Sequence, residues 1–192
     1  MPNLYIIAGC NGAGKTTASF NVLPNMLNCQ EFVNADEIAR GISPFNPEKG
    51  AIRAGKIMLT TIDELLEKQV DFAIETTLTT KSYTRTVAYA QSIGYEVTML
   101  FFWLNSEEMA INRVKQRVKE GGHNIPEETI RRRYHRGIFN LLNIFSDICD
   151  NYMIIDNSTE KYLYIAEKMD GNTIVHSEEL FRFLKQLAHE KK

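Results

Sequence analysis

A phosphate-loop motif near the start of the chain constrains the fold more than any other feature. Residues 9–16 read GCNGAGKT and satisfy the pattern G-x-x-x-x-G-K-[ST] at every fixed position. Residues 4–8 before it are apolar on both faces, as in a buried parallel strand, and residues 15–23 after it read as a helix. A strand, this loop and a helix, in that order, predict a P-loop nucleotide-binding fold.

The loop residues have separate expected tasks. Glycines allow backbone N–H groups to converge on one anion, and the following helix adds its positive end. Lys15 is expected to reach the β- and γ-phosphates, and Thr16 to offer its hydroxyl to Mg²⁺. Cys10 occupies a variable position and is interpreted as a small residue rather than a redox group. The expected nucleotide-binding residues here are Gly9, Asn11, Gly12, Ala13, Gly14, Lys15 and Thr16.

The rest of the chain alternates short apolar runs with helical stretches, which is typical of a parallel sheet covered by helices. Strands are expected at residues 31–34, 71–75, 95–104 and 152–156, and helices at residues 48–69, 82–93, 106–120 and 126–145. Asp170-Gly171 indicates a hairpin between residues 161–169 and 173–175, before a last helix from Ser177. The prediction is one α/β domain, residues 1–192, of the nucleotide-kinase type: a parallel sheet of about five strands, a helical lid near residues 113–136, and a C-terminal hairpin and helix.

Composition restricts the environment and the partners. The three cysteines include no C-x-x-C pair, which argues against a disulfide framework and fits a reducing cytoplasm. No apolar run approaches the roughly 20 residues of a membrane helix. The net charge of −2 argues against binding nucleic acid by bulk electrostatics. We therefore expect a soluble cytoplasmic protein without a membrane or nucleic-acid partner.

Two carboxylates favour a kinase over other P-loop proteins. The chain has no N-K-x-D motif of GTPases, and residues 95–104 end without the acidic residue of motor ATPases. Asp36 follows the second expected strand, where it could take a proton from an acceptor hydroxyl. A helix N-cap is an equally good interpretation of Asp36. Glu75 ends a buried strand, at the edge where parallel α/β sheets bind ligands; a solvated strand end is its alternative.

A basic segment at residues 113–136 favours a kinase too. It holds eight Lys or Arg against three Glu, a local charge of +5, and Gly121-Gly122 could hinge it. Arginines on such a lid can neutralise a transferred phosphoryl group. Arg113 and Arg117 lie one helical turn apart and can face one ligand, whereas residues 131–133 cannot all point the same way. A solvated helix face is the alternative, and His123 is interpreted as a hydrogen-bonding lid residue.

Four segments together resemble the zeta-toxin family of P-loop kinases: residues 9–17, 34–39 (NADEIA), 74–78 (IETTL) and 121–126 (GGHNIP). The resemblance covers roughly residues 3–145. It implies a nucleotide-kinase-like sheet, ATP or GTP with Mg²⁺, an antitoxin partner and phosphorylation of a hydroxyl, in the best-known members on a UDP-N-acetyl amino sugar.

The resemblance also implies roles for individual residues. Asp36 matches the catalytic base, and Glu75, with Thr76 beside it, matches the substrate-binding carboxylate. Arg117 and one of the residues 131–133, with Arg131 and Arg133 as the candidates, would lie on the phosphates. Lys15, Thr17 and Arg113 would complete the nucleotide site.

Two other functions stay open from the sequence. A polynucleotide kinase would use the basic segment to grip a strand and would favour aromatic stacking platforms there, but Tyr134 is the only aromatic residue inside it. A non-catalytic nucleotide switch would bind ATP without turnover, and Asp36 argues against it.

Overall fold

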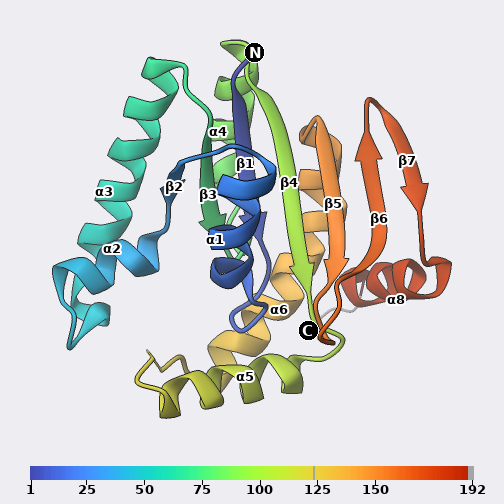
Figure 1. Cartoon of the computed structure of the whole chain (residues 1–192). Coiled ribbons are helices and arrows are strands. Elements are labelled where there is room, and N and C mark those ends of the chain that lie inside the picture. The colour runs from blue at the N-terminus through green and yellow to red at the C-terminus, as the bar shows by residue number, and fades with distance from the viewer. Residues whose placement is uncertain (123, 190–192) are drawn as a thin grey trace.

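The computed structural model describes residues 1–122 and 124–189, so the interpretation of His123 lies outside the described residues. Its strands form one seven-stranded sheet in the order β2-β3-β1-β4-β5-β6-β7 (Figure 1). The first five strands in this order are parallel, and β6 and β7 are antiparallel additions. The strands are β1 Asn3–Ala8, β2 Glu31–Val33, β3 Phe72–Thr76, β4 Glu96–Trp103, β5 Asn151–Asp156, β6 Leu163–Met169 and β7 Asn172–Val175.

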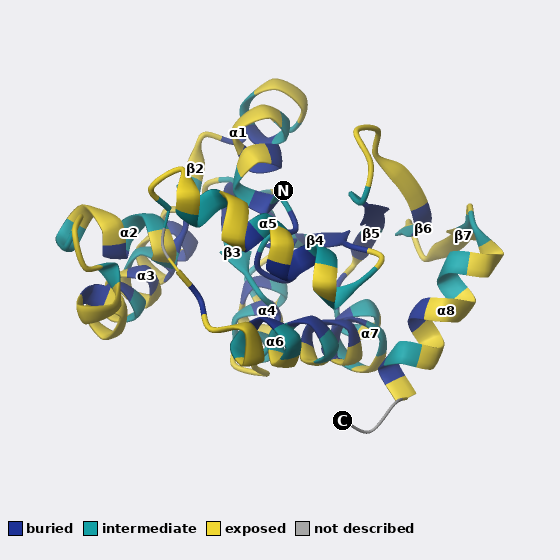
Figure 2. Ribbon diagram, turned by 90° about the horizontal axis from the view of Figure 1, so that it is seen from below, coloured by how far each residue is buried: buried dark blue, intermediate teal, exposed yellow. Residues whose placement is uncertain are grey.

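Helices cover both faces of this sheet. One face carries α1, and the opposite face carries α4 and α6, while α2 and α3 lie beyond the β2 edge (Figures 1 and 2). The helices are α1 Lys15–Met26, α2 Ala35–Ile42, α3 Pro47–Lys68, α4 Tyr83–Ser92, α5 Glu107–Lys119, α6 Glu127–Asn140, α7 Ser146–Ile148 and α8 Glu178–His189, with a π-helical turn η1 Leu141–Phe145 between α6 and α7. The predicted α/β P-loop fold class is confirmed.

The central position of β1 follows from its composition. Leu4 pairs with Phe72 of β3 on one side and with Val97 of β4 on the other. Leu4, Ile6 and Ala8 are fully buried, because a strand between two neighbours and two helical layers meets no solvent. The carboxyl ends of β1, β3 and β4 therefore share one edge, where the loop after β1 begins.

Several boundaries differ from the sequence expectation. Helix α1 continues through Pro24 to Met26 instead of ending at Leu23. The segment after β2 forms a complete helix, α2, which the sequence suggested only as an alternative. The hairpin was predicted, and Asp170 and Gly171 both have positive φ, as its tight turn requires. The sequence did not show that β6 would pair with β5 and extend the same sheet.

No helix within residues 1–122 and 124–189 is long and apolar enough to cross a lipid bilayer.

Candidate functional site

A pocket of about 1060 Å³ opens at the carboxyl edge of the parallel strands. It is lined by the loop after β1, the starts of α1, α2 and α3, the end of β3, and parts of α5 and α6. The structure brings most of the predicted site residues into this one lining: Asn11, Gly12, Gly14, Lys15, Thr16, Thr17, Asp36, Glu75, Arg113, Arg117 and Arg133. Gly9, Ala13, Thr76 and Arg131 lie outside it.

The phosphate loop needs glycine for steric reasons at two positions. A Cβ on Gly9 would lie 2.2 Å from the Phe102 carbonyl oxygen, so the loop leaves β1 in close contact with β4. Gly14 has a φ of +82°, and a Cβ there would lie 2.5 Å from the Asn157 amide nitrogen. These contacts fix the path of the loop between β4 and the end of β5.

Asn157 also orients a peptide group of the loop. Its side-chain amide donates a hydrogen bond to the Ala13 carbonyl at 2.8 Å. The peptide bonds are trans, so the C=O of Ala13 and the N–H of Gly14 point in opposite directions. The Gly14 N–H is therefore directed away from Asn157. Sequence reasoning missed Asn157, because only the fold brings the residue after β5 to this loop.

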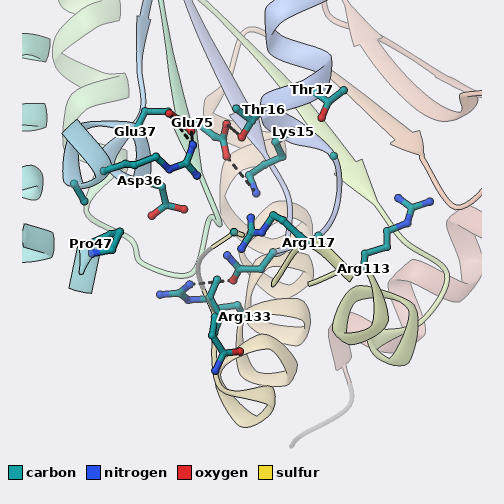
Figure 3. A pocket seen from close by; sticks show the side chains of 18 of the residues that line it. Lys15, Thr16, Thr17, Asp36, Glu37, Pro47, Glu75, Arg113, Arg117 and Arg133 are labelled. Carbon is teal, nitrogen blue, oxygen red and sulfur yellow. Dashed lines mark hydrogen bonds and ion pairs between the residues drawn. The ribbon is translucent and has the colours of Figure 1, made fainter. Parts of the chain in front are cut away.

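Lys15 and Glu75 form a buried charged pair inside the pocket. The Lys15 side chain is only 6% exposed, its Nζ donates to the Cys10 carbonyl at 3.0 Å, and it lies 3.6 Å from Glu75 Oε1. Glu75 Oε2 accepts from the Thr16 hydroxyl at 2.8 Å (Figure 3). It also accepts from Asn34 Nδ2 at 2.9 Å. The strand-end carboxylate is thus held against the phosphate loop instead of pointing freely into solvent.

The Thr16 hydroxyl and the Glu75 carboxylate offer oxygen atoms of the kind that Mg²⁺ prefers. Mg²⁺ usually takes one or two protein ligands and completes its shell with phosphates and water. Within the described part of the chain, no group of three or more His, Cys, Asp or Glu could hold a metal without such help. These residues therefore fit a Mg²⁺ ion that arrives with a nucleotide.

Asp36 stands in the first turn of α2 and faces the pocket. The N-cap of α2 is Asn34, whose Oδ1 accepts from the backbone N–H groups of Asp36 at 2.8 Å and Glu37 at 3.4 Å. The alternative interpretation of Asp36 as the helix cap is therefore wrong. Its carboxylate is exposed in the open pocket (Figure 3).

The arginines of the basic segment have different partners. Arg133 lines the pocket, where its Nη1 donates to Asn11 Oδ1 of the loop at 3.0 Å. Burial lowers the pKa of the Arg133 guanidinium, and the negative charge of Asp36 acts in the opposite direction. Arg117 also lines the pocket, whereas Arg113 extends away from Asp36, and its Nη2 donates to the Ser158 carbonyl at 3.4 Å (Figure 3).

Arg131 takes a different direction from Arg133. Its Nη1 donates to the carboxylates of Glu107 and Glu108 at the start of α5. The structure thus corrects the expectation that Arg131 lies with the phosphate loop: Arg131 is outside the pocket, and Arg133 is the arginine of residues 131–133 that lines it. Thr76 likewise turns to the backbone, since its hydroxyl accepts from the Leu78 N–H at 3.0 Å.

Cys10 is buried in the loop, with 4% of its surface exposed. Burial raises the pKa of its thiol from 9.0 to about 11, and the nearby Lys15 charge offsets only part of this effect. The thiol is therefore neutral near pH 7 and a poor nucleophile. This supports its interpretation as a small packing residue.

Beyond residues 34–39, the side of the pocket formed by α2 and α3 carries no motif that the sequence could reveal. Glu37 and Arg40 line it and form an ion pair at 3.1 Å, and Glu48 and Ala51 of α3 line it as well. These residues come together because α2 packs against α3, which is a tertiary contact between two segments without a diagnostic pattern.

Comparison with known proteins identifies relatives of this chain. A family model described as Zeta toxin matches residues 1–169. An uncharacterized protein of Haemophilus influenzae is 33% identical over 127 residues, which cover 66% of this chain and 88% of that protein.

Solved structures with low sequence identity share the fold. The AvrRxo1-ORF1:-ORF2 structure with ATP contains a chain with a TM-score of 0.81 and 15% identity; the match covers all of this chain and 66% of that one, about two thirds of its length. A structure of the PezAT chromosomal toxin-antitoxin system of Streptococcus pneumoniae matches with a TM-score of 0.68 and 17% identity, over 98% of this chain and 84% of that one. A gluconokinase of Sinorhizobium meliloti matches with a TM-score of 0.53 and 13% identity, over 82% and 83% of the two chains.

Proposed function

This chain belongs to the zeta toxin family, and we propose that it transfers the γ-phosphoryl group of ATP or GTP to a hydroxyl group of a small molecule. The observation that carries the proposal is the shared pocket: the phosphate loop with Lys15 and Thr16, the carboxylate of Asp36 and the guanidinium of Arg133 line one cavity. A non-catalytic nucleotide switch would need the phosphate loop but has no use for a carboxylate facing it.

The reaction can be assigned to the chain's own groups. Residues 12–16 hold the phosphates, and Lys15 exchanges its Cys10 and Glu75 partners for phosphate oxygens. Asp36 accepts the proton of the acceptor hydroxyl, whose oxygen forms the new bond to the γ-phosphorus while the bond to the leaving nucleoside diphosphate breaks. Arg117 and Arg133 neutralise charge on the transferred group. Thr16 would hold a Mg²⁺ ion that arrives with the nucleotide, and the ion would supply positive charge next to the phosphates.

The acceptor and the partners are proposals drawn from the relatives. A UDP-N-acetyl amino sugar is the first acceptor to test, because the family resemblance implies it. The AvrRxo1-ORF1:-ORF2 complex and the PezAT toxin-antitoxin system support a protein partner of the antitoxin type for this chain. A polynucleotide acceptor is disfavoured, because Tyr134 is buried and its hydroxyl donates to the Leu104 carbonyl, so it offers no stacking surface.

A phosphorylation screen tests the proposal. The chain is incubated with labelled ATP, Mg²⁺ and, separately, UDP-N-acetylglucosamine, free nucleosides, simple sugars or a 5′-hydroxyl oligonucleotide, and label transfer is measured. We expect transfer to a small-molecule hydroxyl that Asp36→Asn slows by at least about a hundredfold and that Arg131→Ala retains. Transfer only to the oligonucleotide would identify a polynucleotide kinase. ATP binding without transfer to any acceptor would contradict the proposed function.

A further inference from the structure

The side chain of Asn34 connects two parts of the site that the sequence treats as separate motifs. It is only 5% exposed, and both of its polar atoms are used. Its Oδ1 accepts from the N–H groups of Asp36 and Glu37, which begin α2. Its Nδ2 donates to Glu75 Oε2 at 2.9 Å, at the end of the neighbouring strand β3.

The orientation of this amide is determined by its neighbours. Two backbone N–H groups face one end of it and a carboxylate faces the other. Reversing the amide would place its NH₂ against N–H donors and its oxygen against the Glu75 carboxylate, so only one arrangement satisfies both sides. The planar amide therefore ties the direction of the helix start to the position of Glu75.

From Glu75 the connection continues to the nucleotide loop. The same Oε2 atom that accepts from Asn34 also accepts from the Thr16 hydroxyl at 2.8 Å. The register of the sheet creates this contact: Val33 pairs with Ile74, so Asn34, just after β2, lies beside Glu75 near the end of β3.

We infer that Asn34 is a positioning residue that couples occupancy of the nucleotide loop at Thr16 to the orientation of the first turn of α2, where Asp36 stands. Lys15 exchanges Glu75 for phosphate. The Thr16 oxygen would offer a lone pair to a Mg²⁺ ion that enters with the nucleotide, while the Thr16 O–H keeps donating to Glu75. The Glu75 carboxylate is then held by its hydrogen bonds from Thr16 and Asn34. A shift of this carboxylate moves the planar amide of Asn34, and the Asp36 N–H that donates to this amide follows. The consequence for phosphoryl transfer rests on the proposed function, but the coupling itself requires only nucleotide binding.

The residue type supports coupling as well as capping. Ser, Thr and Asp would cap α2 about as well as Asn does. An Asp here would place a second carboxylate against Glu75, and a single hydroxyl could not serve both backbone N–H groups and the carboxylate at opposite ends. Asn is the capping residue that also carries an NH₂ group within hydrogen-bonding distance of Glu75.

Amide hydrogen exchange on the whole chain tests this inference without any acceptor. The probe is Mg²⁺ with a non-hydrolysable ATP analogue, and the readout is exchange at the Asp36 and Glu37 amides. In the wild type we expect bound analogue to slow this exchange by at least about fivefold, the lower end of ordinary coupling between sites.

Asn34→Asp keeps the capping oxygen and removes the donor, so it should bind the analogue but lose the exchange response. Ser177→Ala removes a cap of α8, far from the pocket, and controls for the loss of stability. Its unfolding midpoint should fall, while bound analogue should still slow exchange at the Asp36 and Glu37 amides.

The outcomes separate the two proposals. Analogue binding without a response in the wild type, or an unchanged response in Asn34→Asp, would each overturn the coupling. Absence of analogue binding in the wild type would instead refute the nucleotide site, and the coupling with it.

Discussion

Replacing Asp36 by Asn removes one charge from the pocket while keeping the shape of the side chain. The cap of α2 belongs to Asn34, so the substitution leaves both capping hydrogen bonds in place. What folding loses is the interaction of a carboxylate with the positive end of α2, typically about 0.3–1 kcal/mol for an exposed first-turn acid. Its unfolding free energy should therefore fall by less than about 1 kcal/mol.

The effect on turnover should be several times larger. A general base contributes about 10²–10⁴-fold, and each tenfold corresponds to about 1.4 kcal/mol of activation free energy. The side-chain amide in Asp36→Asn cannot take the proton from the acceptor hydroxyl, so phosphoryl transfer should slow by about 10²–10⁴-fold while ATP affinity stays near that of the wild type.

The assay measures three quantities on each protein: urea unfolding, ATP binding, and transfer to the acceptor found in the screen. Glu178→Gln is the matched control, because Glu178 is also an acid in the first turn of a helix, α8, but lies outside the pocket. It should lose a similar small amount of stability and no turnover. A loss of turnover below tenfold in Asp36→Asn would refute the assignment of Asp36 as the base.

Three other predictions test separate parts of the site. Lys15→Ala should abolish the stabilisation by ATP, which is about 2.7 kcal/mol at a hundredfold excess over Kd; an ATP-induced shift like that of the wild type in thermal unfolding would contradict this, whatever the midpoint without ligand. Arg133→Ala should slow transfer by about 10²–10³-fold and Arg131→Ala by only a few-fold, so equal losses in steady-state kinetics would remove the distinction between them. Because burial raises the pKa of Cys10 from 9.0 to about 11, its neutral thiol contributes stability below pH 9 that is lost as the pH rises through 11; the unfolding free energy of the wild type relative to Cys10→Ala should fall over that range, and a constant difference would refute the shift.

The fold was predictable where local pattern determines structure. Residues 9–16 and the apolar run before them specify a buried strand and a phosphate loop without any long-range information. The hairpin turn was equally local, since Asp170-Gly171 favours positive φ at both positions. The pairing of β6 with β5 was not predictable, because it depends on which strand edge stays open after the parallel strands have assembled.

The site shows the same division. Asn34 and Asp36 are both good capping residues, and the choice between them depends on which residue keeps an extended backbone; Asn34 does, with φ −131° and ψ 116°. Arg131 and Arg133 lie on different sides of α6, and the phase of the helix alone did not show which side faces the loop. Glu107 and Glu108 at the start of α5 bind Arg131, so Arg133 is the one that faces the loop.

The contact between Asn157 and the Ala13 carbonyl spans 144 residues of sequence. During synthesis, the complete phosphate-loop motif leaves the ribosome long before the residue that orients one of its peptide groups. Nucleotide binding should therefore be a late property of the growing chain, acquired only after β5 has joined the sheet. Ribosome-bound chains that stop before Asn157 should contain the complete phosphate-loop motif but should not bind ATP.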